Sequence, residues 1–164
     1  MNNSPIGVFD SGVGGLTVAR EIMRELPDES IVYFGDTARV PYGSKSRETV
    51  TKFSKQIIRF LKTKDVKAIV IACNTASAFA LHEVAENADI PIIGVIEPGA
   101  RAADNVTKNG RIGIIATEGT VRSGTYEKVL KEINPNLKVF LKACPLFVPL
   151  VEEGWRYDSV TYEV

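Results

Sequence analysis

The sequence is poor in the residues that build metal sites, disulfide scaffolds and histidine-based active sites. It has two cysteines, at positions 73 and 144, and a single histidine, His82. The cysteines lie far apart and form no Cys-x-x-Cys pair, which argues against a disulfide framework and against a zinc site. With one histidine, placed inside an expected helix, a serine–histidine–aspartate triad is also unsupported. We expect no metal, and the sparse cysteine usage favours a reducing cytoplasm.

Net charge and long apolar runs are also missing. The 20 basic and 20 acidic side chains of the 164 residues cancel, so the charge gives no reason to expect a nucleic acid or a membrane surface as partner. No apolar stretch approaches the length of a membrane span, and residues 1–5 lack the basic and apolar regions of a signal peptide. A hydrophobic content of 45% with 24% charged residues is typical of a soluble globular protein. The length allows one ordinary domain, or one and part of a second.

Short apolar runs alternate with segments of helical periodicity along the chain. Strands are expected at residues 6–9, 31–34, 66–72, 91–95, 111–116 and 137–143. Helices are expected at residues 16–26, 46–61, 75–86, 100–106, 121–133 and 147–153, with Ser46 as a cap of the second. Strict alternation with short connections predicts an α/β fold, with a parallel sheet covered by helices on both faces.

The last residues resemble the beginning of a further helix. Asp158 or Ser159 is expected to cap it, but the pattern at residues 158–164 stops after one turn without a terminating signal. We therefore expect the sequence to be a fragment.

Polar residues follow the expected strands at the point where each strand ends. They are Asp10-Ser11, residues 36–44, Cys73-Asn74-Thr75, Glu97, residues 117–120 and Cys144. The carboxyl ends of parallel strands share one edge, and open α/β sheets bind their ligands there. A single crevice at this edge could therefore collect a carboxylate, a thiol, hydroxyls and an amide.

Cys73 ends the third apolar run and precedes an expected helix. The positive end of the helix dipole and its free backbone N–H groups favour the thiolate over the thiol, which makes Cys73 a candidate for chemistry. The alternative is a buried structural cysteine, since free cysteine is among the most buried residue types. Position alone leaves both interpretations open.

The glycine-rich loop at residues 10–15 also allows two interpretations. Gly12-x-Gly14 after a strand, with Asp36 closing the second strand, partly matches a dinucleotide-binding fingerprint. However, Thr17 occupies the place of the third glycine, and the carboxylate of Asp10 would face the pyrophosphate. No lysine is present for a phosphate loop of the Gly-Lys-Ser/Thr kind. The alternative is that the glycines simply let a strand turn sharply into a helix.

Three motifs, in this order along the chain, resemble the glutamate racemases of the Asp/Glu racemase family. They are GVFDSGVGGLT at residues 7–17, YFGDTARVPYG at residues 33–43 and ACNTA at residues 72–76. The stretches ATEGT at residues 116–120 and LVEEG at residues 150–154 extend the likeness, which runs from about Ile6 to Trp155.

The resemblance implies two similar α/β halves with the active site between them. It also implies inversion of the α-carbon of glutamate without pyridoxal phosphate, metal, nucleotide or other cofactor, supplying D-glutamate for peptidoglycan. Such an inversion needs acid/base groups on opposite sides of the substrate, and thiols suit that work. In the family pattern Cys73 is one of these groups, Asp10 assists it, and Glu152 matches an acidic residue near the second cysteine. The implied substrate-binding residues are Asp10, Ser11, Tyr42, Gly43, Asn74, Thr75 and Thr117.

The sequence departs from the family in one important respect. The second acid/base cysteine of the family lies in a later Gly-Cys-Thr-His-type motif, which this sequence lacks. Cys144 is followed by Pro145 and Leu146, and we interpret it as a core cysteine. For Glu152, a solvated charge at a helix end is an equally good interpretation. We expect a first half at residues 1–97, an incomplete second half at residues 98–164, and no racemisation by this chain alone.

Two other functions stay open. One is a racemase of aspartate or a related acidic compound, although the loop DTARVPYG at residues 36–43 favours glutamate. The other is a non-catalytic half-enzyme that holds a ligand, a partner chain or a nucleotide. An unfinished half would leave apolar surface and a sheet edge exposed, so self-association, for example as a homodimer, is also expected.

Overall fold

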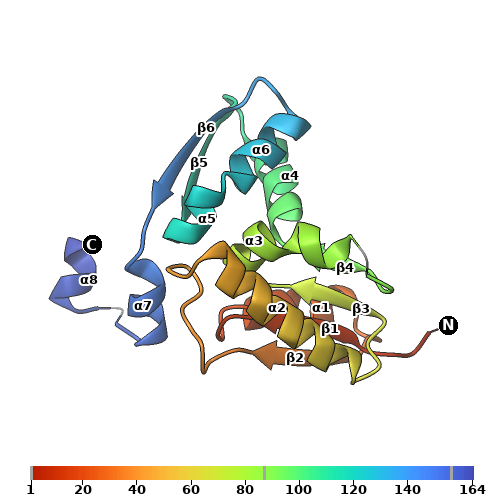
Figure 1. The fold of residues 1–164 in the computed structure, drawn as a ribbon. Helices are drawn as coiled ribbons and strands as arrows, with labels where there is room; N and C mark the ends of the chain where they lie inside the picture. The colour runs from red at the N-terminus through yellow and green to blue at the C-terminus, as the bar shows by residue number, and fades with distance from the viewer. Residues whose placement is uncertain (1, 87, 156) are drawn as a thin grey trace.

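The computed structural model describes residues 2–86, 88–155 and 157–164. In this part of the chain, a four-stranded parallel sheet carries the N-terminal portion (Figure 1). Its strands are β1 (Ile6–Asp10), β2 (Ile31–Gly35), β3 (Ala68–Ile71) and β4 (Ile92–Gly94), in the order β2-β1-β3-β4. Strand β1 is central, with parallel partners on both sides, and all of its residues are buried. The predicted α/β class is confirmed for this sheet.

Helices cover both faces of this sheet. Helix α1 (Leu16–Glu25) packs on one face, where Ile6 and Val8 of β1 meet Ala19. Helices α2 (Arg47–Lys62) and α3 (Asn74–Ala85) pack on the other, around a core that includes Phe9, Ile57, Leu61, Ile69, Ile71 and Phe79. Alternate residues of a strand face opposite sides, so the even-numbered residues of β1 point toward α1. Asp10, the last residue of β1, is one of these even-numbered residues and points to the same side.

Ser46 caps α2, as the sequence predicts. Its Oγ accepts a hydrogen bond from the backbone N–H of Thr49 at 3.2 Å. In Ser46→Ala this N–H loses its partner, and the free energy of unfolding is expected to fall by about 1 kcal/mol. The melting temperature should then fall by about 2–4 °C, measured by calorimetry. The control is Ser30→Ala at an exposed position; an equal loss in both variants would contradict the prediction.

The second sheet is smaller. Among the described residues it consists of β5 (Arg111–Ala116) and β6 (Lys138–Ala143), which pair in parallel. Helices α4 (Ile96–Val106) and α6 (Thr125–Ile133) pack on one face through Ala100, Ile112, Leu130 and Leu137. On the opposite face Ile115 is 68% exposed and Phe140 is 51% exposed. The expected covering of both faces therefore holds for the first sheet, whereas α4 and α6 cover one face of the second.

Two of the predicted helices differ from the structure by more than one residue at an end. The expected helix at residues 121–133 is two helices, α5 (Glu118–Ser123) and α6, because Gly124 between them has φ of 67°, a left-handed conformation that favours glycine. Helix α4 begins at Ile96, so Glu97 and Pro98 lie in its first turn. Proline is tolerated there because the first N–H groups of a helix need no intrahelical acceptor. The division into halves after residue 97 stays a prediction, and it falls within this turn.

The remaining helices are short. Helix α7 (Phe147–Glu152) follows β6, and α8 (Ser159–Glu163) lies farther out at the C-terminal end of the ribbon (Figure 1). Asp158 caps α8, as predicted, by accepting the N–H of Thr161 at 3.1 Å. None of the helices in the described ranges combines the length and the apolar character that crossing a membrane requires.

Direct hydrogen bonds join the two sheet-bearing parts. The N–H of Gly119, in α5, donates to the carbonyl of Gly43 at 2.8 Å. Thr125 Oγ1, at the start of α6, donates to the carbonyl of Ala78 in α3 at 3.3 Å. The approach at Gly43 is close, since a Cβ on that residue would lie 2.5 Å from Cβ of Thr117. The contact between the two parts thus involves α3 and the loop at Gly43.

Candidate active site

A cavity of about 380 Å³ lies where the carboxyl end of the first sheet meets α5 and α7. It is lined by residues from the ends of β1 and β3, from the loop after β2, and from the starts of α3 and α5. The structure brings every residue of the predicted site to this cavity: Asp10, Ser11, Tyr42, Gly43, Cys73, Asn74, Thr75, Thr117 and Glu152. For the residues that follow β1, β2 and β3, the shared edge of a parallel sheet predicts this co-location. Thr117 and Glu152 follow strands of the second sheet, so they reach the cavity because the two parts pack together. The role of each residue stays a prediction.

Cys73 lies between β3 and α3 and is the N-cap of the helix. Its Sγ accepts a hydrogen bond from the N–H of Ala76 at 3.4 Å, and the thiol donates to Ser11 Oγ at 3.5 Å. The residue is only 6% exposed and belongs to the main core cluster, yet it lines the cavity. Burial and cavity access are therefore both present, so the structural and the chemical interpretations of this cysteine are compatible.

The expectation that the helix start favours the thiolate of Cys73 is not met. Burial raises the pKa of its thiol, and the negative charge of Asp10 raises it further. The contacts with Ser11 and with the N–H of Ala76 lower the pKa but do not prevail. The sequence indicated the helix N-terminus correctly, but desolvation depends on tertiary packing and outweighs it. Burial thus favours the neutral thiol over the thiolate.

Asp10 holds the first loop together. One of its carboxylate oxygens, Oδ2, accepts the backbone N–H groups of Gly12 at 3.1 Å and Gly15 at 3.0 Å. These are the donors that a dinucleotide-binding loop would offer to a pyrophosphate. Because a carboxylate of the chain itself occupies them, the nucleotide interpretation of this loop loses its support.

The glycines of this loop let neighbouring atoms approach the backbone closely. They do not provide a left-handed turn. Within the described chain, positive φ at glycine occurs at positions 110, 124 and 154, outside the loop. At Gly15, however, a Cβ would lie 2.5 Å from Cβ of Asp10 and 2.9 Å from Cβ of Ala72. The loop packs directly against the ends of β1 and β3, which brings Asp10 and Cys73 to the same wall of the cavity.

Tyr42 is oriented by a buried ion pair. Its hydroxyl donates a hydrogen bond to Asp36 Oδ2, and Arg39 Nε lies 2.8 Å from the same oxygen. The ring is 1% exposed, and burial followed by the contact with Asp36 raises the pKa of its hydroxyl. The side-chain hydroxyl is thus already engaged by Asp36. The backbone N–H groups of Tyr42 and Gly43 donate to none of the described residues. They are therefore the groups of this loop that can donate a hydrogen bond to a ligand.

Three threonine hydroxyls form a cluster where α3 meets α5. Thr75 Oγ1 lies 2.9 Å from Thr117 Oγ1 and 3.2 Å from Thr120 Oγ1, and the last two lie 3.0 Å apart. Thr117 also caps α5 by accepting the N–H of Thr120 at 3.3 Å. Thr75 and Thr117 were predicted as site residues, whereas Thr120 was noted only as part of a motif. The cluster ties the two parts of the chain together at the cavity wall.

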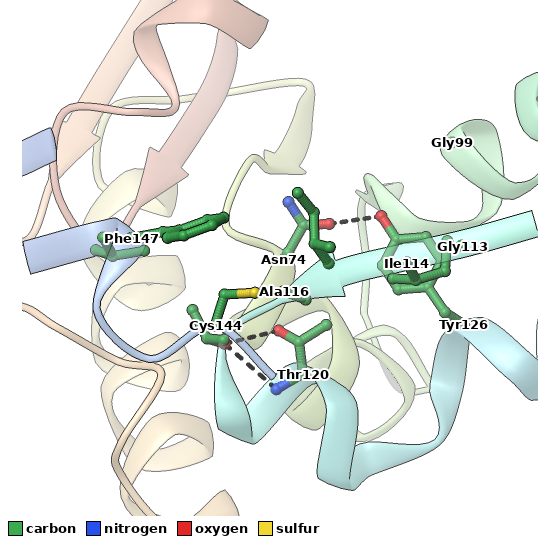
Figure 2. A pocket seen from close by; sticks show the side chains of 12 residues that line it. Asn74, Gly99, Gly113, Ile114, Ala116, Thr120, Tyr126, Cys144 and Phe147 are labelled. Atoms are coloured by element: carbon green, nitrogen blue, oxygen red, sulfur yellow. Dashed lines mark hydrogen bonds between the residues drawn. The ribbon is translucent and has the colours of Figure 1, made fainter. Parts of the chain in front are cut away.

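Glu152 and Cys144 differ in their relation to the cavity. Glu152, at the end of α7, lies over the first loop, since a Cβ on Gly12 would be 2.8 Å from its Oε1. Cys144 is half-buried rather than in the core, which corrects the prediction. It lines a second cavity of about 520 Å³ between β5, α6 and α7 (Figure 2). Strand β6 ends at Ala143, so Cys144 lies beyond the sheet that would have covered it.

Sequence reasoning assigned no role to two tyrosines of this region. Tyr126, in α6, lines both cavities, and its hydroxyl donates to Asn74 Oδ1 at 2.7 Å (Figure 2). Tyr33, in β2, donates its hydroxyl to the carbonyl of Gly12 at 3.1 Å. Tyr33 lies within the motif at residues 33–43 and could have been flagged there. Tyr126 gave no signal, because its contact with Asn74 joins residues 52 positions apart.

The ionisation of Tyr33 should make stability depend on pH. Burial, followed by the charges of Asp10, Cys73 and Glu152, raises its pKa from 10.0 to about 12. An unfolded chain would lose this proton near pH 10, whereas the folded chain keeps it to about pH 12. The contribution to stability is therefore complete below pH 10 and is lost as the pH rises toward 12.

Urea unfolding midpoints measured across this alkaline range should fall, and the fall should be smaller in Tyr33→Phe. Tyr157→Phe, at an 86% exposed tyrosine, serves as the control and should behave as the wild type. Identical pH profiles for Tyr33→Phe and wild type would refute the prediction.

Comparison with known proteins finds one family and relatives of one name. The model of the Asp/Glu/hydantoin racemase family matches residues 6–151. A glutamate racemase of Geobacter metallireducens is 59% identical over 157 residues, which are 96% of this chain and 58% of that protein. A glutamate racemase of Streptococcus pneumoniae is 53% identical over 164 residues, 100% of this chain and 62% of that protein.

Solved structures agree with these relatives. A glutamate racemase from Bacillus anthracis superposes with a TM-score of 0.93 at 52% identity, covering 99% of this chain and 60% of that one. A glutamate racemase from Francisella tularensis, solved in complex with D-glutamate, gives a TM-score of 0.90 at 47% identity, covering 98% of this chain and 60% of that one. The chain thus spans less than two thirds of the length of these relatives.

Proposed function

Because the chain belongs to the Asp/Glu/hydantoin racemase family, we propose that it forms one face of a glutamate racemase active site, with Cys73 as the acid/base group on that face. The observation that carries the proposal is the arrangement at the end of β3. The thiol of Cys73 lies 3.5 Å from Ser11 Oγ, the residue shares the cavity with Asp10, and it is only 6% exposed.

The raised pKa of Cys73 suits proton transfer at carbon. The α-proton of an amino acid is a weak acid, so a strongly basic thiolate is the better acceptor, although less of it is present. In one direction the thiolate takes the α-proton and becomes the thiol. In the other direction the thiol gives its proton to the carbanion that a group on the opposite side has generated. Asp10 disfavours the thiolate by its charge, and thereby strengthens its basicity.

The cavity also offers the groups that an amino diacid requires. The N–H groups of Gly43, Asn74 and Thr75 donate to none of the described residues, and two of them belong to the first turn of α3. Such groups bind carboxylates. Asp10 Oδ1 accepts no hydrogen bond from the described residues, so it is free to accept one from the substrate ammonium. Ser11 lies between these donors and Cys73.

Glutamate is the proposed substrate, and D-glutamate for peptidoglycan the proposed product. Aspartate or a related acid is the alternative within the family. The support for glutamate is the match to racemases of that name along the whole described chain, including the loop at residues 36–43. The second alternative, a binding module, is favoured by one observation: Cys73 is the one cysteine that lines this cavity in the described chain. The proposal assigns the chain no cofactor.

The 164-residue chain by itself is expected to bind glutamate without racemising it, because proton return to the opposite face needs a second acid/base group. Titrations followed by thermal shift should show stabilisation by L- or D-glutamate, less by aspartate, and none by a dinucleotide. Formation of D-glutamate from L-glutamate should stay at the background rate in a coupled assay.

Two results would count against the proposal. Stabilisation by a dinucleotide alone would remove the racemase interpretation of the first loop. D-Glutamate formation by the isolated chain that is lost in Cys73→Ser would show that a second group is present after all. Sedimentation at several protein concentrations would show in addition whether the chain forms the expected homodimer.

A further inference from the structure

A hydrogen bond between two distant segments lies at the border of the two cavities. Asn74 is the first residue of α3 and directly follows Cys73, whereas Tyr126 is in the first turn of α6. The hydroxyl of Tyr126 donates to Asn74 Oδ1 at 2.7 Å, as Figure 2 shows. The bond therefore links the part of the chain that bears Cys73 to the helix that covers the second sheet.

Tyr126 is the fixed member of this pair. Its ring is half-buried and packs against the main core cluster. The start of α6 is itself anchored on α3 by Thr125 Oγ1, which donates to the carbonyl of Ala78 at 3.3 Å. A phenol ring has few rotamers, so packing of the ring also fixes the position of the hydroxyl. Burial raises the pKa of Tyr126, which keeps the hydroxyl protonated as a donor.

Asn74 is the less restrained member. Its side chain is exposed, and its amide nitrogen Nδ2 donates to none of the described residues. Without the phenol, the amide could rotate or flip, because nothing else among the described residues holds it. With Oδ1 bound to the phenol, the planar amide places its nitrogen on the side away from Tyr126, as Figure 2 shows.

We propose that Tyr126 is a positioning residue: it holds the Asn74 amide in the one orientation that offers its NH₂ group to a carboxylate in the Cys73 cavity. The role of that carboxylate as part of a substrate rests on the proposed function. Asn74 is not one of the proposed acid/base groups, so we expect the effect on affinity rather than on the chemical step. One hydrogen bond of ordinary strength changes the population of the competent orientation, and hence the affinity, by about fivefold.

Two measurements on the 164-residue chain test the proposal. The first needs no ligand: the side-chain amide resonances of Asn74 are compared by NMR in the wild type, Tyr126→Phe and the control Tyr157→Phe. We expect a shift in Tyr126→Phe and none in the control. Unchanged Asn74 resonances in Tyr126→Phe would overturn the proposal.

The second measurement is a double-mutant cycle on the affinity for L-glutamate, determined by calorimetric titration. Tyr126→Phe should weaken binding about fivefold, and it should have no further effect in an Asn74→Ala background. Additive losses would overturn the proposal, because Tyr126 would then act independently of Asn74. A wild-type chain that does not bind glutamate would refute the proposed function, while the resonance comparison would still decide the role of Tyr126.

Discussion

Replacement of Cys73 by alanine is expected to lower racemisation of glutamate by a factor of about 10²–10⁴, the usual contribution of a positioned acid/base group. The effect should lie in kcat, with little change in KM. Sγ contacts the N–H of Ala76 and Ser11 Oγ. The proposed ligand groups are backbone donors and the side chains of Asp10 and Asn74, which the substitution leaves in place. The measurement is exchange of the α-proton with solvent deuterium, in an active racemase that contains these 164 residues.

Cys144→Ala is the matched control. It removes the other thiol of the chain, which lies in the second cavity and outside the proposed site. Its exchange rate should equal that of the wild type. Cys73→Ser should be as slow as Cys73→Ala, because a serine hydroxyl is far less acidic than a thiol. Comparable activity of Cys73→Ala and Cys144→Ala would remove Cys73 from the mechanism.

Substitution of Gly15 by alanine is expected to destabilise the fold by about 1–3 kcal/mol, the usual cost of an extra methyl group in a closely packed place. The new Cβ would lie 2.5 Å from Cβ of Asp10, 2.9 Å from Cβ of Ala72 and 3.0 Å from the hydroxyl oxygen of Tyr33. Two of these three atoms are Cβ atoms, which cannot move unless the backbone moves. Relief of the contact must therefore displace the first loop or the end of β1.

Gly113→Ala provides the comparison. Gly113 lies in β5, its φ is not in the left-handed region, and nothing lies within 4 Å of the position that a Cβ on this residue would occupy. Its melting temperature should stay within about 1–2 °C of the wild type, whereas each kcal/mol lost in Gly15→Ala lowers the midpoint by about 2–4 °C. Calorimetry of the two variants tests this prediction. Equal melting temperatures would contradict it, because the loop would then accommodate the methyl group without loss of stability. Glutamate affinity should fall in Gly15→Ala as well, since Asp10 moves with the loop.

Local patterns predicted the elements of the fold better than their arrangement. Strand β5 occupies the predicted residues 111–116, because its apolar run is bounded by a glycine and by a capping threonine. Strand β3 is shorter than the apolar run at residues 66–72 from which it was predicted. Val66 is buried although it lies before the strand, so its apolar character reflects burial rather than strand pairing. The spatial order β2-β1-β3-β4 left no trace in any local pattern, because pairing depends on contacts between distant segments. The break at Gly124 did have a signal, a glycine inside a helical pattern.

The candidate site was likewise predictable where it depends on local patterns, and not where it depends on tertiary packing. That Asp10 and Cys73 would meet follows from the parallel sheet, and their neighbours were found by motif. Thr117 follows a strand of the second sheet, so its place at the cavity depends on how the two parts pack. The direction of the Tyr42 side chain was not predictable, because it depends on how Asp36 and Arg39 pair in a buried place. The pKa of Cys73 was predicted in the wrong direction for a similar reason. Desolvation is a property of the assembled core and cannot be inferred from a helix start.

The triangle of threonine hydroxyls has a consequence for how tightly an anion can be held. Each hydroxyl has one proton, and within the ring of Thr75, Thr117 and Thr120 that proton can already be given to a neighbour. An incoming carboxylate that accepts from one of them exchanges one bond for another, with little net gain. The backbone N–H groups of Gly43, Asn74 and Thr75 give up no bond within the described chain. For the proposed substrate, we therefore expect these hydroxyls to add less to the affinity than the backbone N–H groups do.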